Sequence, residues 1–100
     1  MRTYVIEREI PGAGRFTADD LREISRKSCA ELDKLGTGIQ WVQSFVTDDK
    51  IYCVYRATSA DLVRRHAAGG GFPANVIAEV RAVIDPTTAE APAPRAVAGA

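Results

Sequence analysis

The chain has 100 residues, enough for one small domain with a hydrophobic core of its own. Hydrophobic residues make up 46% and charged residues 26%, a balance that is ordinary for soluble globular proteins. Thirteen basic and thirteen acidic residues cancel, so no excess of positive charge attracts a phosphate backbone. We therefore expect no nucleic-acid partner.

The sequence also carries no sign of export or membrane insertion. Its first ten residues lack the apolar core of a signal peptide, and no apolar run approaches the ~20 residues of a membrane span. We expect a cytoplasmic protein with no membrane partner. Two cysteines, Cys29 and Cys53, are too few for a disulfide framework, and we expect both to be buried free thiols.

Four segments are predicted to be strands: residues 3–10, 39–47, 50–57 and 76–84. Side chains alternate between the two faces of a strand. In the first segment we expect one set to face the core (Tyr4, Ile6 and Ile10) and the other to face solvent, a cleft or a partner (Val5, Glu7 and Glu9). The third segment is almost continuously apolar, which is typical of a central strand.

Two helices are predicted between these strands. Thr17 is an N-cap, and Asp20, three residues later, completes a capping box. The helix after this cap carries a stripe at spacings of three and four (Leu21, Ile24, Ser28, Leu32 and Leu35). Ser59 caps the second helix, and the glycines at 69–71 end it. These glycines are not a phosphate-binding loop, because they come after a helix and lack the lysine and hydroxyl residue of that motif.

The order strand, helix, strand, strand, helix, strand is that of the ferredoxin-like α+β fold. It predicts a four-stranded antiparallel sheet of order 4-1-3-2 with both helices on one face. Residues 1–86 form this domain, and residues 87–100 are expected to be a disordered tail rich in alanine and proline.

The other sheet face is left open by this arrangement. We expect it to hold Glu7, Trp41 or Val42, Tyr55 and Glu79. A face with aromatic side chains needs a cover, and a second copy of the chain is the simplest one. We therefore expect a homodimer.

His66 and two carboxylates are the candidates for a chemical site. The proposed strand order brings Glu7, on the first strand, close to the middle of the third and fourth strands, and Glu79 lies on the fourth. Such a site, with imidazole, carboxylate and water, suits nickel, copper or zinc better than magnesium. The carboxylates could also meet Arg8 or Arg81 there. The alternatives are a cross-strand ion pair of Glu7 or Glu79 with Arg81, and a core role for His66. A Cys53–His66 nucleophilic pair lacks an orienting third group.

Several short stretches together resemble a known family. They are the strand at 4–8, Trp41-Val42, the strand at 52–57, His66-Ala67, Gly71-Phe72-Pro73 and Glu79-Val80. This ordered set, spread over residues 3–86, resembles the small bacterial nickel-binding-protein-like family. That family is a ferredoxin-like domain of unknown function, similar to the dimeric alpha-beta barrel proteins. The resemblance implies a homodimer, nickel or another divalent transition metal, and no organic cofactor. It favours His66, Glu7 and Glu79 as metal ligands.

Three functions are consistent with these features. The first is an accessory, non-catalytic metal-binding protein. The second, by analogy of fold, is a small-molecule-binding protein or cofactor-independent enzyme with a cavity between sheet and helices. Aromatic side chains and one thiol would line that cavity (Trp41, Phe45, Tyr55, Phe72 and Cys53), with Glu7 or His66 as acid or base. The third is a dimeric interaction module whose polar residues only form structural pairs.

Overall fold

The computed structural model describes residues 1–90 of the chain. Its strands are β1 (Arg2–Glu9), β2 (Ile39–Val46), β3 (Lys50–Ala57) and β4 (Val76–Glu79). Its helices are α1 (Ala18–Leu35) and α2 (Ala60–Gly70), and three short 3-10 turns are η1 (Ala13–Arg15), η2 (Gly36–Gly38) and η3 (Pro86–Glu90). No helix in this part of the chain has the length and apolar character to cross a bilayer.

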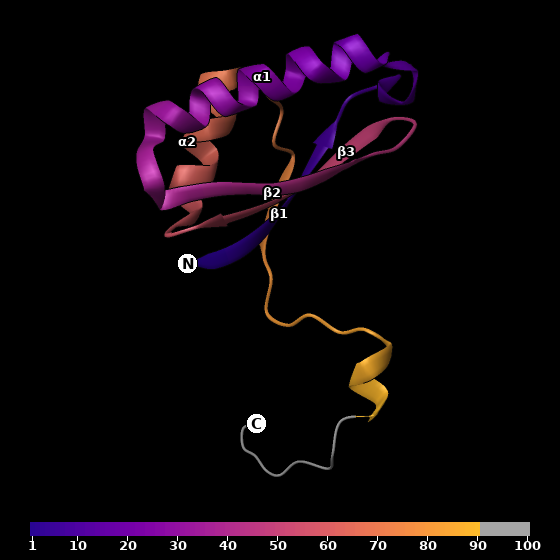
Figure 1. Ribbon diagram of the computed structural model, residues 1–100, viewed down its shortest axis with the longest axis vertical. Coiled ribbons are helices and arrows are strands. Elements are labelled where there is room, and N and C mark those ends of the chain that lie inside the picture. The colour runs from indigo at the N-terminus through magenta and orange to yellow at the C-terminus, as the bar shows by residue number, and fades with distance from the viewer. Residues whose placement is uncertain (91–100) are drawn as a thin grey trace.

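The four strands form one antiparallel sheet in the order β2-β3-β1-β4. Read from the β4 edge this is 4-1-3-2, and the arrangement is consistent with the ferredoxin-like fold. β1 and β3 pair along their whole length, from Arg2 opposite Ala57 to Glu9 opposite Lys50. Figure 1 shows α1 and α2 together on one side of the sheet.

Local sequence signals set where the helices begin and end. The Thr17 hydroxyl accepts the Asp20 N–H at 3.1 Å, and the Asp20 carboxylate accepts the Thr17 N–H at 2.9 Å, which completes the predicted capping box. At the end of α2, Gly71 adopts the left-handed conformation, with a φ of 70°. The chain then turns, and the Phe72 N–H donates to the Ala67 carbonyl at 2.9 Å. This turn directs Phe72 back under α2.

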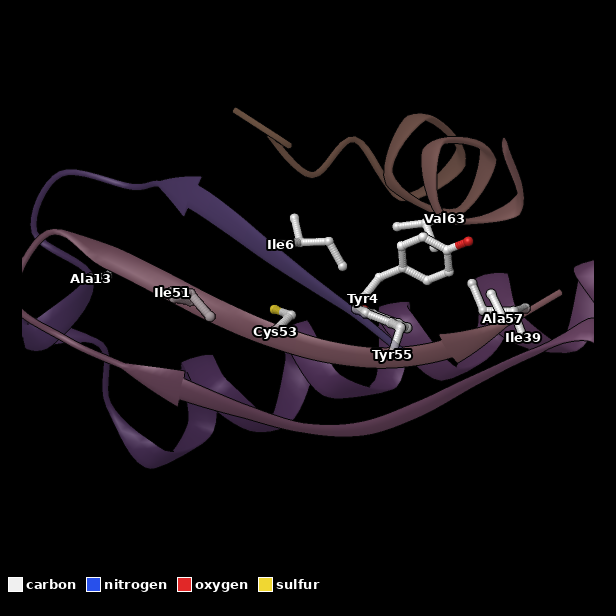
Figure 2. Close-up of a cluster of buried hydrophobic side chains, with 9 residues drawn as sticks. All are labelled: Tyr4, Ile6, Ala13, Ile39, Ile51, Cys53, Tyr55, Ala57 and Val63. Carbon is white, nitrogen blue, oxygen red and sulfur yellow. The ribbon is translucent and has the colours of Figure 1, made fainter. Parts of the chain in front are cut away.

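The core lies between the sheet and the helices. Its buried members come mostly from one face of β1 and β3, with Val63 added from α2 (Tyr4, Ile6, Ile39, Ile51, Cys53, Tyr55, Ala57, Val63 and, from η1, Ala13). Figure 2 shows this cluster, with Val63 pointing from α2 toward the side chains of the sheet. The predicted core parity of β1 is correct for Tyr4 and Ile6.

The burial of Tyr55 and a β-bulge in β2 correct the expected facing of three aromatic residues. The register between β2 and β3 shifts between Trp41 and Gln43, so Val42 is the extra residue. Trp41 lies opposite the buried Tyr55, and both therefore face the helices, not the open side. Beyond the bulge the parity is reversed. Phe45, which was expected to line the cavity, lies opposite Tyr52 on the open face and is 52% exposed.

The fourth strand is shorter than predicted, ending at Glu79 instead of residue 84. Glu79 lies opposite Tyr4, so only the first residues of β1 remain to pair with the chain beyond Glu79. Val83 and Ile84, which the prediction placed in the strand, are exposed for this reason. The predicted tail begins within the exposed turn η3 (Pro86–Glu90), and residues 91–100 lie outside the described residues.

Candidate functional site

A buried polar cluster links the two helices to the centre of the sheet. His66 of α2 has no solvent exposure, and its Nε2 lies 2.9 Å from the Tyr55 hydroxyl and 3.1 Å from the Ser28 hydroxyl. Within residues 1–90 its other nitrogen, Nδ1, has no hydrogen-bond partner. Three elements, α1, β3 and α2, thus meet at one ring nitrogen of one residue.

Arg8 is the second polar group of this interior. It shares the parity of Tyr4 and Ile6 on β1 and is only 3% exposed. Its Nε–H donates to the Cys53 thiol at 3.3 Å, and its Nη1 donates to the Pro73 carbonyl at 2.6 Å. The guanidinium also lies 5.4 Å from the centre of the Phe72 ring. All three partners are uncharged, so they orient the positive charge without neutralising it.

A cavity opens beside this cluster, between α1 and the sheet. Its volume is about 80 Å³. Apolar side chains form most of its wall, joined by the hydroxyls of three serines and Tyr55 and by Arg8 (Arg8, Ile10, Leu21, Ile24, Ser25, Ser28, Trp41, Ser44, Val46, Ile51, Cys53, Tyr55 and Phe72). Trp41, Tyr55, Cys53 and Phe72, the four residues chosen from the sequence as a pocket, all line it.

Burial also sets the protonation of the cluster. It lowers the pKa of His66 below its usual value, and the charge of Arg8 lowers it further, whereas Glu31 acts in the opposite direction. Burial raises the pKa of the Tyr55 hydroxyl. At neutral pH the site therefore holds a neutral imidazole, a neutral phenol and a charged guanidinium.

The three predicted metal ligands lie apart in one copy of the chain. Glu7 faces the open side of the sheet, where its carboxylate accepts a hydrogen bond from Lys50 at 2.6 Å. Glu79, opposite Tyr4 on the other face, lies 3.7 Å from Arg2. The expected partner Arg81 is in neither pair. His66 is in the core with its Nε2 held by two hydroxyls, so strand order alone did not bring these groups together.

The polar cluster does not fit a divalent cation within a single copy. Among residues 1–90, no three side chains of the His, Cys, Asp or Glu type come close enough to share a metal ion. Arg8 adds a positive charge to the interior, and its charge opposes a second one near His66.

Cys29 is exposed on α1, contrary to expectation, because the apolar stripe runs through the preceding residue, Ser28.

Arg8 and Ser28 are the members of the site that the sequence interpretation missed. Ser28 was placed on the buried stripe of α1, yet was not recognised as a partner for His66. Arg8 was considered only as a partner for carboxylates, although its parity places it with Tyr4 and Ile6. A charged residue on the core parity of a central strand is the signal that would have identified it.

Comparison with known proteins identifies a family and, separately, a structure of similar fold. No curated protein sequence matches the chain. A crystal structure of SCO4226 from Streptomyces coelicolor A3(2) is similar in fold, with a TM-score of 0.68 and 23% sequence identity, over 82% of this chain and 99% of that one. The family model described as nickel-responsive protein SCO4226-like matches residues 4–80, which include both helices and nearly all of the four strands. The chain therefore belongs to the nickel-responsive SCO4226-like family.

Proposed function

We propose that this protein acts in the nickel response as a small homodimeric, metal-binding protein of the cytoplasm, accessory to other proteins and not itself a catalyst. The observation that carries the proposal is the family match, which extends through every strand of the sheet and both helices. The metal would be nickel or another divalent transition metal.

The open sheet face supports the homodimer. Phe45 and Val76, on the two edge strands of this face, are 52% and 47% exposed. Between them Val5 and Val54 occupy the central strands. An apolar sheet face of this kind is commonly covered by a second copy of the same chain.

A second copy could also supply the metal ligands that one copy lacks. Glu7 lies on the open face, where residues of two copies could meet across the twofold axis. Because one copy supplies no group of three ligands among residues 1–90, the proposal requires groups from both copies. It assigns no coordination geometry to them.

Calorimetric titration of tag-free protein with nickel chloride tests this function. We expect binding in the micromolar range or tighter, lost or weakened in Glu7→Gln. Glu79→Gln and His66→Gln test the other two ligands predicted from the sequence. Arg65→Gln, an exposed change on α2, is the control. Wild-type protein that releases no heat and retains no nickel after dialysis would rule out direct metal binding.

A second candidate function is favoured by the cavity itself. A mostly apolar hollow bounded by aromatic rings, with a few converging polar groups, is the usual form of a small-molecule site. We propose that it holds a small ligand between α1 and the sheet. Trp41 is the only tryptophan of the chain and lines the cavity, so its fluorescence reports occupation. Ile24→Phe, which fills the cavity from α1, should abolish any such response.

A further inference from the structure

Arg8 carries a positive charge into the interior without a negative partner among residues 1–90. None of the ion pairs in this part of the chain includes it. Its Nη2 is buried and meets no acceptor. A guanidinium stays charged at any physiological pH, so Arg8 cannot avoid this situation by losing a proton. A buried charge with no counter-charge is strongly unfavourable unless something supplies one.

The neighbouring elements do not supply the missing negative charge. From α1, Lys27 is a second cation, 5.7 Å from the centre of the same Phe72 ring that Arg8 contacts. Glu31, also from α1, is held by Lys34 at 2.8 Å. From α2 the nearest titratable group is His66. The interior around Arg8 is therefore electropositive.

Among residues 1–90, Arg8 is also the only charged residue in the wall of the cavity. Ser25, Ser28 and Ser44 line the same space, and serine hydroxyls can donate hydrogen bonds to an acceptor. The remaining wall is mainly aliphatic and aromatic. An occupant would thus meet one positive charge and a few hydroxyl-bearing side chains in an otherwise apolar wall.

We propose that this cavity binds a small monocarboxylate with a short apolar tail, whose carboxylate is the missing partner of Arg8. The proposal rests on the second candidate function given above and names the chemical class of its ligand. A volume of about 80 Å³ has room for only a few heavy atoms. A cavity of about 150 Å³ is needed to hold benzene, so the enclosed part of the ligand is smaller than an aromatic ring.

The chemistry of the wall favours a carboxylate over a phosphate. Two of the three guanidinium nitrogens already donate, Nε to Cys53 and Nη1 to Pro73, which leaves Nη2 for a ligand. A carboxylate with one such contact and a hydroxyl donor is satisfied, whereas the oxygens of a phosphate would face aliphatic walls unpaired. A neutral molecule would fill the cavity but leave Arg8 without a counter-charge.

A comparison of sodium butyrate with butyramide tests the proposal in the full chain. The two probes have nearly the same shape and differ in charge. Trp41 fluorescence and amide chemical shifts are followed at constant ionic strength. We expect butyrate to bind at least about tenfold more tightly than butyramide, because a charge-assisted hydrogen bond is the stronger kind. Arg8→Met should remove this preference, and Arg56→Met, an exposed arginine of β3, should keep it.

The outcomes separate this inference from the function on which it rests. If both probes bind equally, the cavity is a ligand site but the carboxylate assignment is wrong. If neither probe changes the signals of cavity residues, both the site and its ligand class are wrong. The comparison of the two probes on wild-type protein gives this result even if Arg8→Met does not fold. Butyrate binding that persists unchanged in a folded Arg8→Met protein would also overturn the assignment.

Discussion

The phenol oxygen of Tyr55 lies 2.9 Å from Nε2 of His66, and this contact joins the centre of the sheet to α2. Ser28 reaches the same nitrogen from α1. The only histidine of the chain therefore connects three elements, and replacing it should destabilise the fold.

We predict that His66→Ala lowers the free energy of unfolding by about 3 kcal/mol, because it leaves a cavity and two buried hydroxyls without their partner. Urea unfolding followed by circular dichroism measures this loss. Arg64→Ala, an exposed change on the same helix, should shift stability by no more than about 0.5 kcal/mol. Equal effects in the two variants would contradict the structural role of His66.

Stability should fall as the pH drops through the region where His66 titrates. Burial lowers its folded pKa, so below the unfolded value of about 6.5 the unfolded chain binds a proton that the folded chain does not. The contribution of neutral His66 to stability is therefore complete above the unfolded pKa. It is lost progressively as the pH falls from there to the folded pKa. The slope is at most about 1.4 kcal/mol per pH unit. Urea titrations from neutral to mildly acidic pH measure it, and in His66→Gln the slope in this window should disappear.

Two adjacent glycines of α2 should respond to alanine with opposite signs. A methyl group on Gly70 would collide with the Phe72 ring, so we expect Gly70→Ala to destabilise the fold by about 1–3 kcal/mol. A methyl group on Gly69 meets only the movable carboxylate of Glu31, and Gly69→Ala should gain up to about 1 kcal/mol from helix propensity. Thermal unfolding of both variants measures these two changes in stability. A stabilised Gly70→Ala would mean that Phe72 does not pack as described.

If two copies of the chain pair through the open sheet face, a charge introduced on that face should weaken the dimer. Phe45→Glu should shift the protein toward the monomer, since the residue is exposed on the open face of β2. Sedimentation velocity over a range of concentrations measures the change. Val83→Glu is the matched control, because Val83 is even more exposed but lies outside the sheet. An unaltered sedimentation coefficient in Phe45→Glu would place any interface elsewhere.

Much of the fold could be predicted because its local signals agree with one another. Thr17 with Asp20 indicated the start of α1, and the alternation of β1 indicated its buried face. The bulge at Val42 could not be predicted, because nothing in the β2 sequence marks the extra residue. It reversed the assignment of Phe45 and of every residue after it in the strand.

The site was harder to predict than the fold. Trp41, Tyr55, Cys53 and Phe72, chosen for their aromatic or thiol character, line the cavity, whereas Phe45 does not. Glu7 and Glu79 were both expected on the open face. Only Glu7 faces that side, because Glu79 lies opposite the buried Tyr4. Arg8 was missed because a charged residue is seldom assigned to a core.

The position of β1 in the sheet has a consequence for how the protein folds during synthesis. β1 is made first, yet it is a central strand whose partners are β3 and β4. Until residues 50–57 have emerged, neither edge of β1 can pair, and the β4 edge stays open until residue 79 is made. While residues 10–57 are made, the nascent chain therefore carries a strand with both edges unpaired, the state in which chaperone binding or misassociation is most effective.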